Sequence, residues 1–297
     1  MTLDQLRIFV AVAELEHVTR AAGQLNLTQS AVSAAIGALE YRHDLKLFDR
    51  IGRRVALTQE GRAFLAEARA LLVAAQRTEK VLADIGGLKA GRLNVAASQT
   101  TGNYWLPPRL ARFAELYPGV TVQLTIGNTH EVAELAIAGE IDLGLVEGAV
   151  SDPLLTVARV DDDELLVVAA PALATKLAGA DAAAIHDAPW VAREKGSGTR
   201  EAFEELIQSV APPGHAPRVV LELPSNESLR TAVEAGAGLA VLSSLVARAS
   251  IKAGALAPLP FSLPKRPFYI LSHRQLYTSR AAKALLALMR ESAANPH

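Results

Sequence analysis

Polar side chains at two places in this sequence are suited to binding a ligand. At the first place, Gln29, Ser30 and Ser33 lie outside the apolar pattern of a segment with helical spacing. A glutamine amide can pair with the N6 and N7 edge of adenine, and a serine hydroxyl can bond to any base. Exposed at the start of a helix, these side chains suit the reading of bases in the major groove of DNA.

The second place is the segment Gly196-Ser-Gly-Thr-Arg200, which follows a short strand pattern at 190–193. Its two glycines free the backbone to approach a ligand, and Ser197 and Thr199 supply hydroxyl groups. A helix that begins at Thr199 directs its free amides to the same point, which favours anions, and Arg200 adds a fork of donors. Taken alone, this segment is explained equally well by ordinary helix capping.

Similar polar residues follow four other strand patterns between residues 92 and 223. Ligands of open α/β sheets bind beyond the carboxyl ends of the strands, so we expect these residues to line one pocket. The predicted pocket residues are Ser98, Gln99, Thr100, Thr129, Glu147, Ser197, Gly198, Thr199, Arg200 and Asn226. Donors outnumber acceptors, which predicts a small anionic ligand with a carboxylate, sulfate or phosphate. Glu147 is expected either to hold Arg200 or to meet a positive group of the ligand.

No set of catalytic residues accompanies them. The segment Gly196-Ser197-Gly198 is not the Gly-x-Ser-x-Gly elbow of serine hydrolases, and the 7 histidines are scattered without the spacing of metal ligands. The sequence has 0 cysteines, which excludes disulfides, zinc fingers and thiol catalysis. No Gly-x-Gly-x-x-Gly motif follows a strand. The sequence therefore predicts no enzyme activity, no metal and no cofactor.

Length and composition indicate a folded protein of two or three domains. The chain has 297 residues, of which 50% are hydrophobic, and a formal net charge of −1. Because the charges nearly balance, any contact with DNA must come from a local basic patch. The N-terminus lacks the pattern of a signal peptide, and no apolar run approaches the roughly 20 residues of a membrane span. We therefore expect a cytoplasmic protein without membrane contact.

The element that presents Gln29 is predicted to be a helix-turn-helix. Apolar residues from Val18 to Leu25 have helical spacing, Asn26-Leu27 can form the turn, and Thr28 stands where an N-cap belongs. Apolar residues from Ala31 to Leu39 then form the buried face of a second helix. The alternative is an ordinary helical hairpin with a polar start.

A β-hairpin with a basic tip is predicted to follow. Gly52 permits a tight turn, and three arginines surround it. Such a cluster suits contacts with DNA phosphates, although a solvated surface patch has the same composition. The predicted DNA-binding residues are therefore Thr28, Gln29, Ser30, Ser33, Arg50, Arg53 and Arg54.

A long helix is predicted between Thr58 and the Gly86-Gly87 pair. Its apolar positions advance by alternating steps of four and three, which is the heptad pattern of a coiled-coil seam. These positions are Phe64, Ala68, Leu71, Ala75, Thr78, Leu82 and Ile85. We expect a linker helix that forms a homodimer, and the alternative is a helix packed on its own domain. From Gly91 onward, strand and helix patterns alternate, which predicts an α/β fold with mostly parallel sheets.

In an ordered set of residues the chain resembles the LysR-type transcriptional regulators. These residues are Thr28-Gln-Ser-Ala-Val-Ser-x-x-Ile36-x-x-Leu39-Glu40, then Leu47-Phe48-x-Arg50, then Leu57-Thr58-x-x-Gly61. The segments Gly196–Arg200 and Leu143-Gly-Leu-Val-Glu147-Gly resemble the subgroup that regulates carbon dioxide fixation and sulfur assimilation.

The resemblance implies a winged helix-turn-helix DNA-binding domain at 1–58, a linker helix and hinge at 59–90, and an effector-binding domain at 91–297. The implied function is a DNA-binding transcriptional regulator controlled by a small-molecule effector. Its implied partners are double-stranded promoter DNA, RNA polymerase and further copies of the chain, as a homodimer or homotetramer.

The resemblance further implies that the effector-binding domain consists of two Rossmann-like subdomains, similar to periplasmic binding proteins. Subdomain I would comprise 91–161 and 268–297, subdomain II would comprise 162–267, and the effector would bind between them. The alternative function is a receptor-like ligand-binding protein without a direct DNA role. The DNA-binding pattern of residues 1–58 argues against that alternative.

Overall fold

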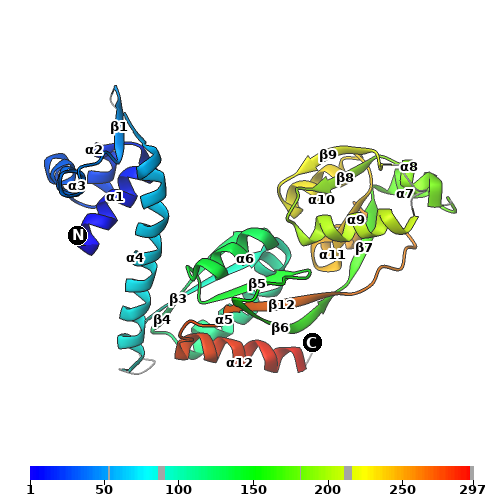
Figure 1. Cartoon of the computed structure of the whole chain (residues 1–297). Coiled ribbons are helices and arrows are strands. Elements are labelled where there is room, and N and C mark those ends of the chain that lie inside the picture. The colour runs from blue at the N-terminus through cyan, green and yellow to red at the C-terminus, as the bar shows by residue number, and fades with distance from the viewer. Residues whose placement is uncertain (53, 86–90, 181, 211–215, 295–297) are drawn as a thin grey trace. The chain divides into compact units, whose positions relative to one another are not determined.

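The computed structural model describes residues 1–52, 54–85, 91–180, 182–210 and 216–294, which fall into two compact units, 1–82 and 83–297. The first unit begins with three helices, α1 (Leu3–Leu15), α2 (Val18–Gln24) and α3 (Gln29–His43). A hairpin of β1 (Phe48–Ile51) and β2 (Arg54–Leu57) follows, and then the long helix α4 (Gln59–Ile85) (Figure 1).

Local signals in the sequence determine where α1 and α3 begin. Thr2 caps α1 in a reciprocal capping box with Gln5. Thr28 caps α3, because its hydroxyl accepts a hydrogen bond from the backbone amide of Ala31 at 3.2 Å. In the turn before it, Asn26 has a φ of 54°, a left-handed conformation that asparagine tolerates better than most residues. The predicted helix-turn-helix is confirmed.

The first unit has a core that α4 completes. Val12, Ala21 and Val32, from α1, α2 and α3, are buried in one cluster. A neighbouring cluster around Phe9 of α1 includes Ala68 of α4, which is 1% exposed. The early turns of α4 are therefore part of the core of the first unit.

Helix α4 changes character along its length. The structure buries Ala68 within its own unit, so the prediction of a seam for a second copy is wrong for that part of the helix. Leu71 and Leu82 are 45% and 67% exposed. A step of 11 residues returns an α-helix to nearly the same side. The later turns of α4 therefore carry an exposed apolar stripe.

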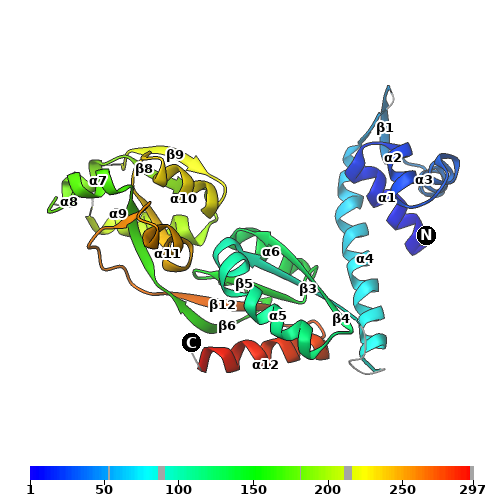
Figure 2. The same cartoon turned by 180° about the vertical axis from the view of Figure 1, so that it is seen from behind.

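The second unit contains two lobes, which we call lobe I and lobe II. Lobe I is built on a five-stranded sheet in the order β4-β3-β5-β12-β6. Its strands are β3 (Gly91–Ser98), β4 (Val120–Gly127), β5 (Leu143–Glu147), β6 (Leu155–Asp163) and β12 (Arg266–His273). Helices α5 (Pro107–Leu116) and α12 (Arg280–Ala294) lie on one side of this sheet, and α6 (Thr129–Ala138) lies on the other (Figure 2).

Lobe II contains a sheet in the order β10-β7-β11 and a pair formed by β8 and β9, joined by a bridge between Trp190 and Leu239. Its strands are β7 (Leu165–Ala169), β8 (Trp190–Arg193), β9 (Val219–Leu223), β10 (Ala240–Ser243) and β11 (Ala257–Pro258). Its helices are α7 (Pro171–Lys176), α8 (Ala182–Asp187), α9 (Gly198–Val210), α10 (Asn226–Glu234) and α11 (Ser244–Lys252).

The strands β6 and β12 connect the lobes. They pair along their whole lengths, from Arg266 with Asp163 to His273 with Leu155. Only Glu164 separates β6 from β7 of lobe II. Both crossing segments therefore leave lobe I at the Arg266–Asp163 pair.

The prediction of mostly parallel sheets is only partly right. Strand β3 is parallel to β4 and β5, and β8 is parallel to β9. In contrast, β12 is antiparallel to β5 and β6, and β10 and β11 are antiparallel to β7. The cause is the double crossing, since a chain that returns from lobe II re-enters the first sheet in the opposite direction. No helix among the described residues is both long enough and apolar enough to cross a bilayer.

Candidate functional site

The first candidate surface is the outer start of α3. The side chains of Thr28, Gln29, Ser30 and Ser33 are all exposed there. Val32, in the same turns of α3, is fully buried and fixes the rotation of the helix against the rest of the first unit. The prediction that Ala31 lies on the buried face is wrong, because Ala31 is exposed. The structure thus brings the four predicted base-reading residues onto one free surface.

The predicted β-hairpin of β1 and β2, which we call the wing, is held to the rest of the first unit by a backbone hydrogen bond. The Val55 amide donates to the Glu16 carbonyl at 3.0 Å, which anchors β2 to the end of α1. Gly52 has a φ of 61°, so the tip needs a residue that tolerates the left-handed region. Arg50 and Arg54 are exposed on either side of it. Arg53 lies outside the described residues.

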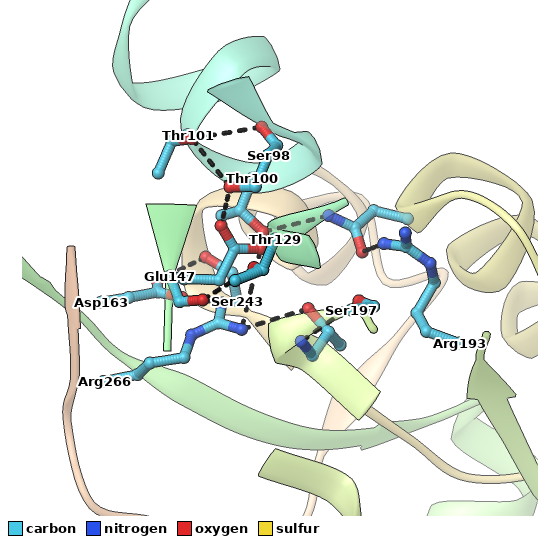
Figure 3. Close-up of polar contacts among 12 residues, drawn as sticks. Ser98, Thr100, Thr101, Thr129, Glu147, Asp163, Arg193, Ser197, Ser243 and Arg266 are labelled. Carbon is cyan, nitrogen blue, oxygen red and sulfur yellow. Dashed lines mark hydrogen bonds and ion pairs between the residues drawn. The ribbon is translucent and has the colours of Figure 1, made fainter. Parts of the chain in front are cut away.

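The second candidate site is a set of buried polar residues between lobe I and lobe II, which we call the polar cluster (Figure 3). It consists of Ser98, Thr100, Thr101, Thr129, Glu147, Asp163, Arg193, Ser197, Thr199, Asn226, Ser243 and Arg266, all buried. Most follow the carboxyl ends of strands, as expected for a ligand site in an α/β fold.

In lobe I the polar cluster is organised around Glu147, at the end of β5. Its carboxylate accepts a hydrogen bond from the Ser98 hydroxyl, at the end of β3. Its backbone carbonyl accepts from the Thr129 hydroxyl at 2.9 Å, at the start of α6. Three predicted pocket residues from three elements therefore meet at one point.

In lobe II the buried guanidinium of Arg193 organises the polar cluster. It donates two hydrogen bonds to the Glu194 carboxylate, at 2.7 and 2.8 Å, and one to the Asn226 side-chain oxygen at 2.6 Å. The Asn226 amide donates in turn to the Thr100 hydroxyl of lobe I at 3.0 Å. This chain of hydrogen bonds crosses from one lobe to the other.

Between the lobes, Arg266 faces two buried carboxylates. Its guanidinium is 2.5 Å from Asp163 and 3.8 Å from Glu147. Asp163 also accepts from the Ser243 hydroxyl at 2.5 Å. Burial raises the pKa of Asp163 above its ordinary value, while Arg266 and the Ser243 hydrogen bond act to lower it. Glu147 thus faces a positive protein side chain, which Asp163 contacts more closely.

Three hydroxyl groups of the polar cluster act as acceptors within the protein and keep their own protons. Thr100 accepts from Asn226 at 3.0 Å, Thr199 from Arg266 at 3.3 Å, and Ser197 from the Thr199 amide at 3.3 Å. None of the described residues accepts a hydrogen bond from these three hydroxyls. A hydroxyl has one proton to donate, so each can donate to an oxygen of a ligand.

The remaining predicted pocket residues have different surroundings. The Gln99 amide donates to the Pro224 carbonyl at 3.4 Å, again between the lobes. At Gly198, an added Cβ would lie 2.5 Å from the Glu147 carbonyl oxygen, so only glycine allows α9 this close to β5.

Arg200 is not brought to the polar cluster. Its guanidinium is 2.7 Å from both Glu204 and Glu222, and it donates to the Arg193 carbonyl at 2.8 Å. The prediction that Glu147 holds Arg200 is wrong, because Arg266 faces Glu147 instead. The physical reason is helical rotation, since consecutive residues of α9 point about 100° apart, and burying Thr199 turns Arg200 away. The alternative, that Glu147 meets a positive group of the ligand, stays a prediction.

Sequence reasoning missed Asp163, Arg193, Ser243 and Arg266. Asp163 and Arg266 stand in segments with the charge and proline content of ordinary linkers. The opposite charges of Asp163 and Arg266, at the two boundaries between the predicted subdomains, were the available signal for this pair. For Arg193, the signal was a charge at the end of an otherwise apolar strand pattern, because such a charge needs a buried partner.

Asn226→Leu tests the hydrogen-bond chain of the polar cluster. The substitution leaves a buried N–H of Arg193 without its acceptor, so we expect the free energy of unfolding to fall by roughly 1–3 kcal/mol in urea denaturation. The control is Arg159→Ala, which removes a largely exposed ion pair with Asp162 and should cost at most about 1 kcal/mol. Equal losses in the two variants would contradict a structural role for Asn226.

Profiles of two protein domains match the chain. The LysR substrate binding domain matches residues 86–294, and the bacterial regulatory helix-turn-helix protein, lysR family, matches residues 3–62.

Similar proteins cover nearly the whole chain. The uncharacterized HTH-type transcriptional regulator YeiE of Escherichia coli (strain K12) is 34% identical over 96% of each chain. The HTH-type transcriptional regulator CysL of Bacillus subtilis (strain 168) is 33% identical over 98% of this chain and 97% of CysL. The probable RuBisCO transcriptional regulator of Nostoc sp. (strain PCC 7120) is 31% identical over 95% of this chain and 86% of the relative.

Solved structures share the fold. CbnR complexed with its target DNA aligns with a TM-score of 0.74 and 23% identity, over 98% of this chain and 100% of CbnR. The regulatory domain of Synechocystis PCC6803 CcmR in complex with 2-PG aligns with a TM-score of 0.61 and 28% identity. That alignment covers 69% of this chain and 99% of the CcmR domain.

Proposed function

This chain belongs to the LysR family of DNA-binding transcriptional regulators, and we propose that a small anionic metabolite bound at the polar cluster controls its action at a promoter. The observation that carries the proposal is the set of free hydroxyl protons on Thr100, Ser197 and Thr199, buried and drawn from both lobes. The chain is a regulator and not an enzyme. The receptor-like alternative is disfavoured because a DNA-binding module occupies residues 3–62.

The free hydrogen-bond donors of the polar cluster favour an anionic effector over a cationic one. Glu147 accepts a hydrogen bond from Ser98 and faces Arg266, so its charge already has a positive side chain nearby within the protein. Each of the three hydroxyls, in contrast, has a proton free to donate to an oxygen of the ligand. The CcmR regulatory domain, at 28% identity, was solved with the anionic metabolite 2-PG. We therefore take 2-PG and inorganic phosphate as the first effectors to test.

We infer that the first unit binds double-stranded promoter DNA through the start of α3 and the wing. The support is the exposure of Thr28, Gln29, Ser30 and Ser33 at the start of α3, together with the exposure of Arg50 and Arg54 in the wing. A regulator bound there acts in the cytoplasm, with RNA polymerase as a further partner. In this proposal Arg53 also contacts phosphate.

We further infer that residues 59–90 link a DNA-binding domain, 1–58, to an effector-binding domain, 91–297, and that the later turns of α4 form the dimer interface. The support is the exposed apolar stripe of Leu71 and Leu82, because two such leucines on one side of a helix gain stability by pairing with a second copy. We extend this inference to a homotetramer as the final assembly.

Gln29→Ala tests base reading. We expect binding to the promoter upstream of the chain's own gene to weaken by roughly 1–3 kcal/mol, and binding to random DNA to weaken less. Gel-shift titration at one salt concentration measures both. Gln76→Ala, on the exposed surface of α4, is the matched control and should change neither. Equal weakening of Gln29→Ala on both DNAs would remove Gln29 from the base-reading set.

Thr199→Val tests the effector site. It keeps the shape of the side chain but removes a hydroxyl that can donate to the ligand, so the affinity for 2-PG should fall about tenfold or more in calorimetry. Thr125→Val, at an exposed position of β4, is the matched control. Footprinting without 2-PG should be the same for both variants and the wild type. An unchanged affinity in Thr199→Val and in Ser98→Ala would move the effector site elsewhere.

Leu82→Glu tests the dimer. A two-fold interface carries the buried charge twice, so the dissociation constant should rise at least about 100-fold in sedimentation equilibrium. Gln76→Glu places the same charge on the other side of α4 and should leave the dimer intact. A Leu82→Glu protein that sediments as a stable dimer would show that the stripe is not the interface.

A further inference from the structure

Arg266 occupies the point where both crossing strands leave lobe I. It is the first residue of β12 and pairs in register with Asp163, the last residue of β6. Both residues are buried, at 6% and 1% exposure, and their side chains point toward each other (Figure 3). Any change in the relative setting of the lobes must pass through these strands.

The guanidinium of Arg266 contacts three different elements at once. It is 2.5 Å from Asp163 on β6, 3.3 Å from the Thr199 hydroxyl on α9 of lobe II, and 3.8 Å from Glu147 on β5 of lobe I. One side chain therefore touches a crossing strand and both lobes. A planar fork of donors can make these contacts together, whereas the single ammonium of lysine cannot.

Stability alone does not account for this arrangement. Two buried carboxylates surround one guanidinium, and the Nε of Arg266 is buried without a hydrogen-bond partner among the described residues. Apolar residues of similar volume often stabilise such a position as well as a buried ion pair does. The unmet donor and the excess of carboxylates indicate a role other than holding the strands together.

The contact with Thr199 suggests that role. Because the Thr199 oxygen accepts from Arg266, its proton is directed to another partner. Resting on the effector site proposed above, we propose that Arg266 is a positioning residue. It fixes the direction of the Thr199 hydroxyl for the anionic effector and links that hydroxyl, through Asp163, to the crossing strands. Effector binding is then transmitted to the setting of the two lobes.

A double-mutant cycle tests the proposal with 2-PG and inorganic phosphate as probes. Arg266→Lys keeps the charge but cannot hold Thr199 and Asp163 together, so the affinity for the probes should fall about tenfold or more. The double variant of Arg266→Lys and Thr199→Val should bind no more weakly than the weaker single variant, because the two side chains act as one unit. Arg159→Lys, on an exposed part of β6, should bind like the wild type.

Solution X-ray scattering provides a second measurement. Saturating 2-PG should change the radius of gyration of the wild type, and should change it less in Arg266→Lys at equal saturation. A purely structural role for Arg266 would leave this change intact once the ligand is bound. If Arg266→Lys does not fold, the same cycle is run with Asp163→Asn, which loosens the guanidinium from β6 and should again be non-additive with Thr199→Val.

The outcomes separate the two proposals. A wild-type protein that binds neither probe overturns the proposed effector class and this inference with it. Wild-type binding combined with losses that multiply in the double variant overturns only the role of Arg266. An undiminished scattering change in saturated Arg266→Lys likewise overturns only the link to the crossing strands.

Discussion

The close contact between Gly198 and the Glu147 carbonyl sets how near the two lobes approach each other. A Cβ at Gly198 would lie 2.5 Å from that carbonyl oxygen. The His130 amide donates to the Gly196 carbonyl at 3.2 Å beside it. The hydrogen bond from Asn226 to Thr100 and the contact of Arg266 with Glu147 both need this short separation. The absence of one methyl group thus permits the polar cluster to span both lobes.

The function proposed for the polar cluster depends on hydroxyl protons that have no acceptor among the described residues. Most polar groups buried in proteins are satisfied, because an unsatisfied one costs free energy. Here the acceptors of Thr100, Ser197 and Thr199 are used while their protons are kept. Such a site is preorganised for a ligand with several oxygen atoms. Binding is favourable because the ligand supplies the hydrogen-bond acceptors that the described residues do not supply.

In the first unit, helix α4 contributes both to the core and to an exposed apolar stripe, and one continuous sequence pattern covers both parts. The early turns of α4 close the core around Phe9, whereas Leu71 and Leu82 are left exposed. A continuous pattern of apolar residues at steps of three and four is compatible with both tasks. Which residues of α4 are buried depends on where α1 and β1 pack against the helix. The pattern of apolar residues in α4 itself does not contain that information.

The sequence by itself determined the helix-turn-helix, its Thr28 cap, the wing, and the strand ends that carry Ser98, Glu147 and Ser197, because caps, turns and periodicity are local properties. Only the tertiary structure decided that Arg266, and not Arg200, meets Glu147. These side chains lie far apart in sequence, and their meeting depends on the rotation of α9 and on the register of β12 with β6. Long-range register and helix rotation follow from packing of the whole unit, so local pattern could not reveal them.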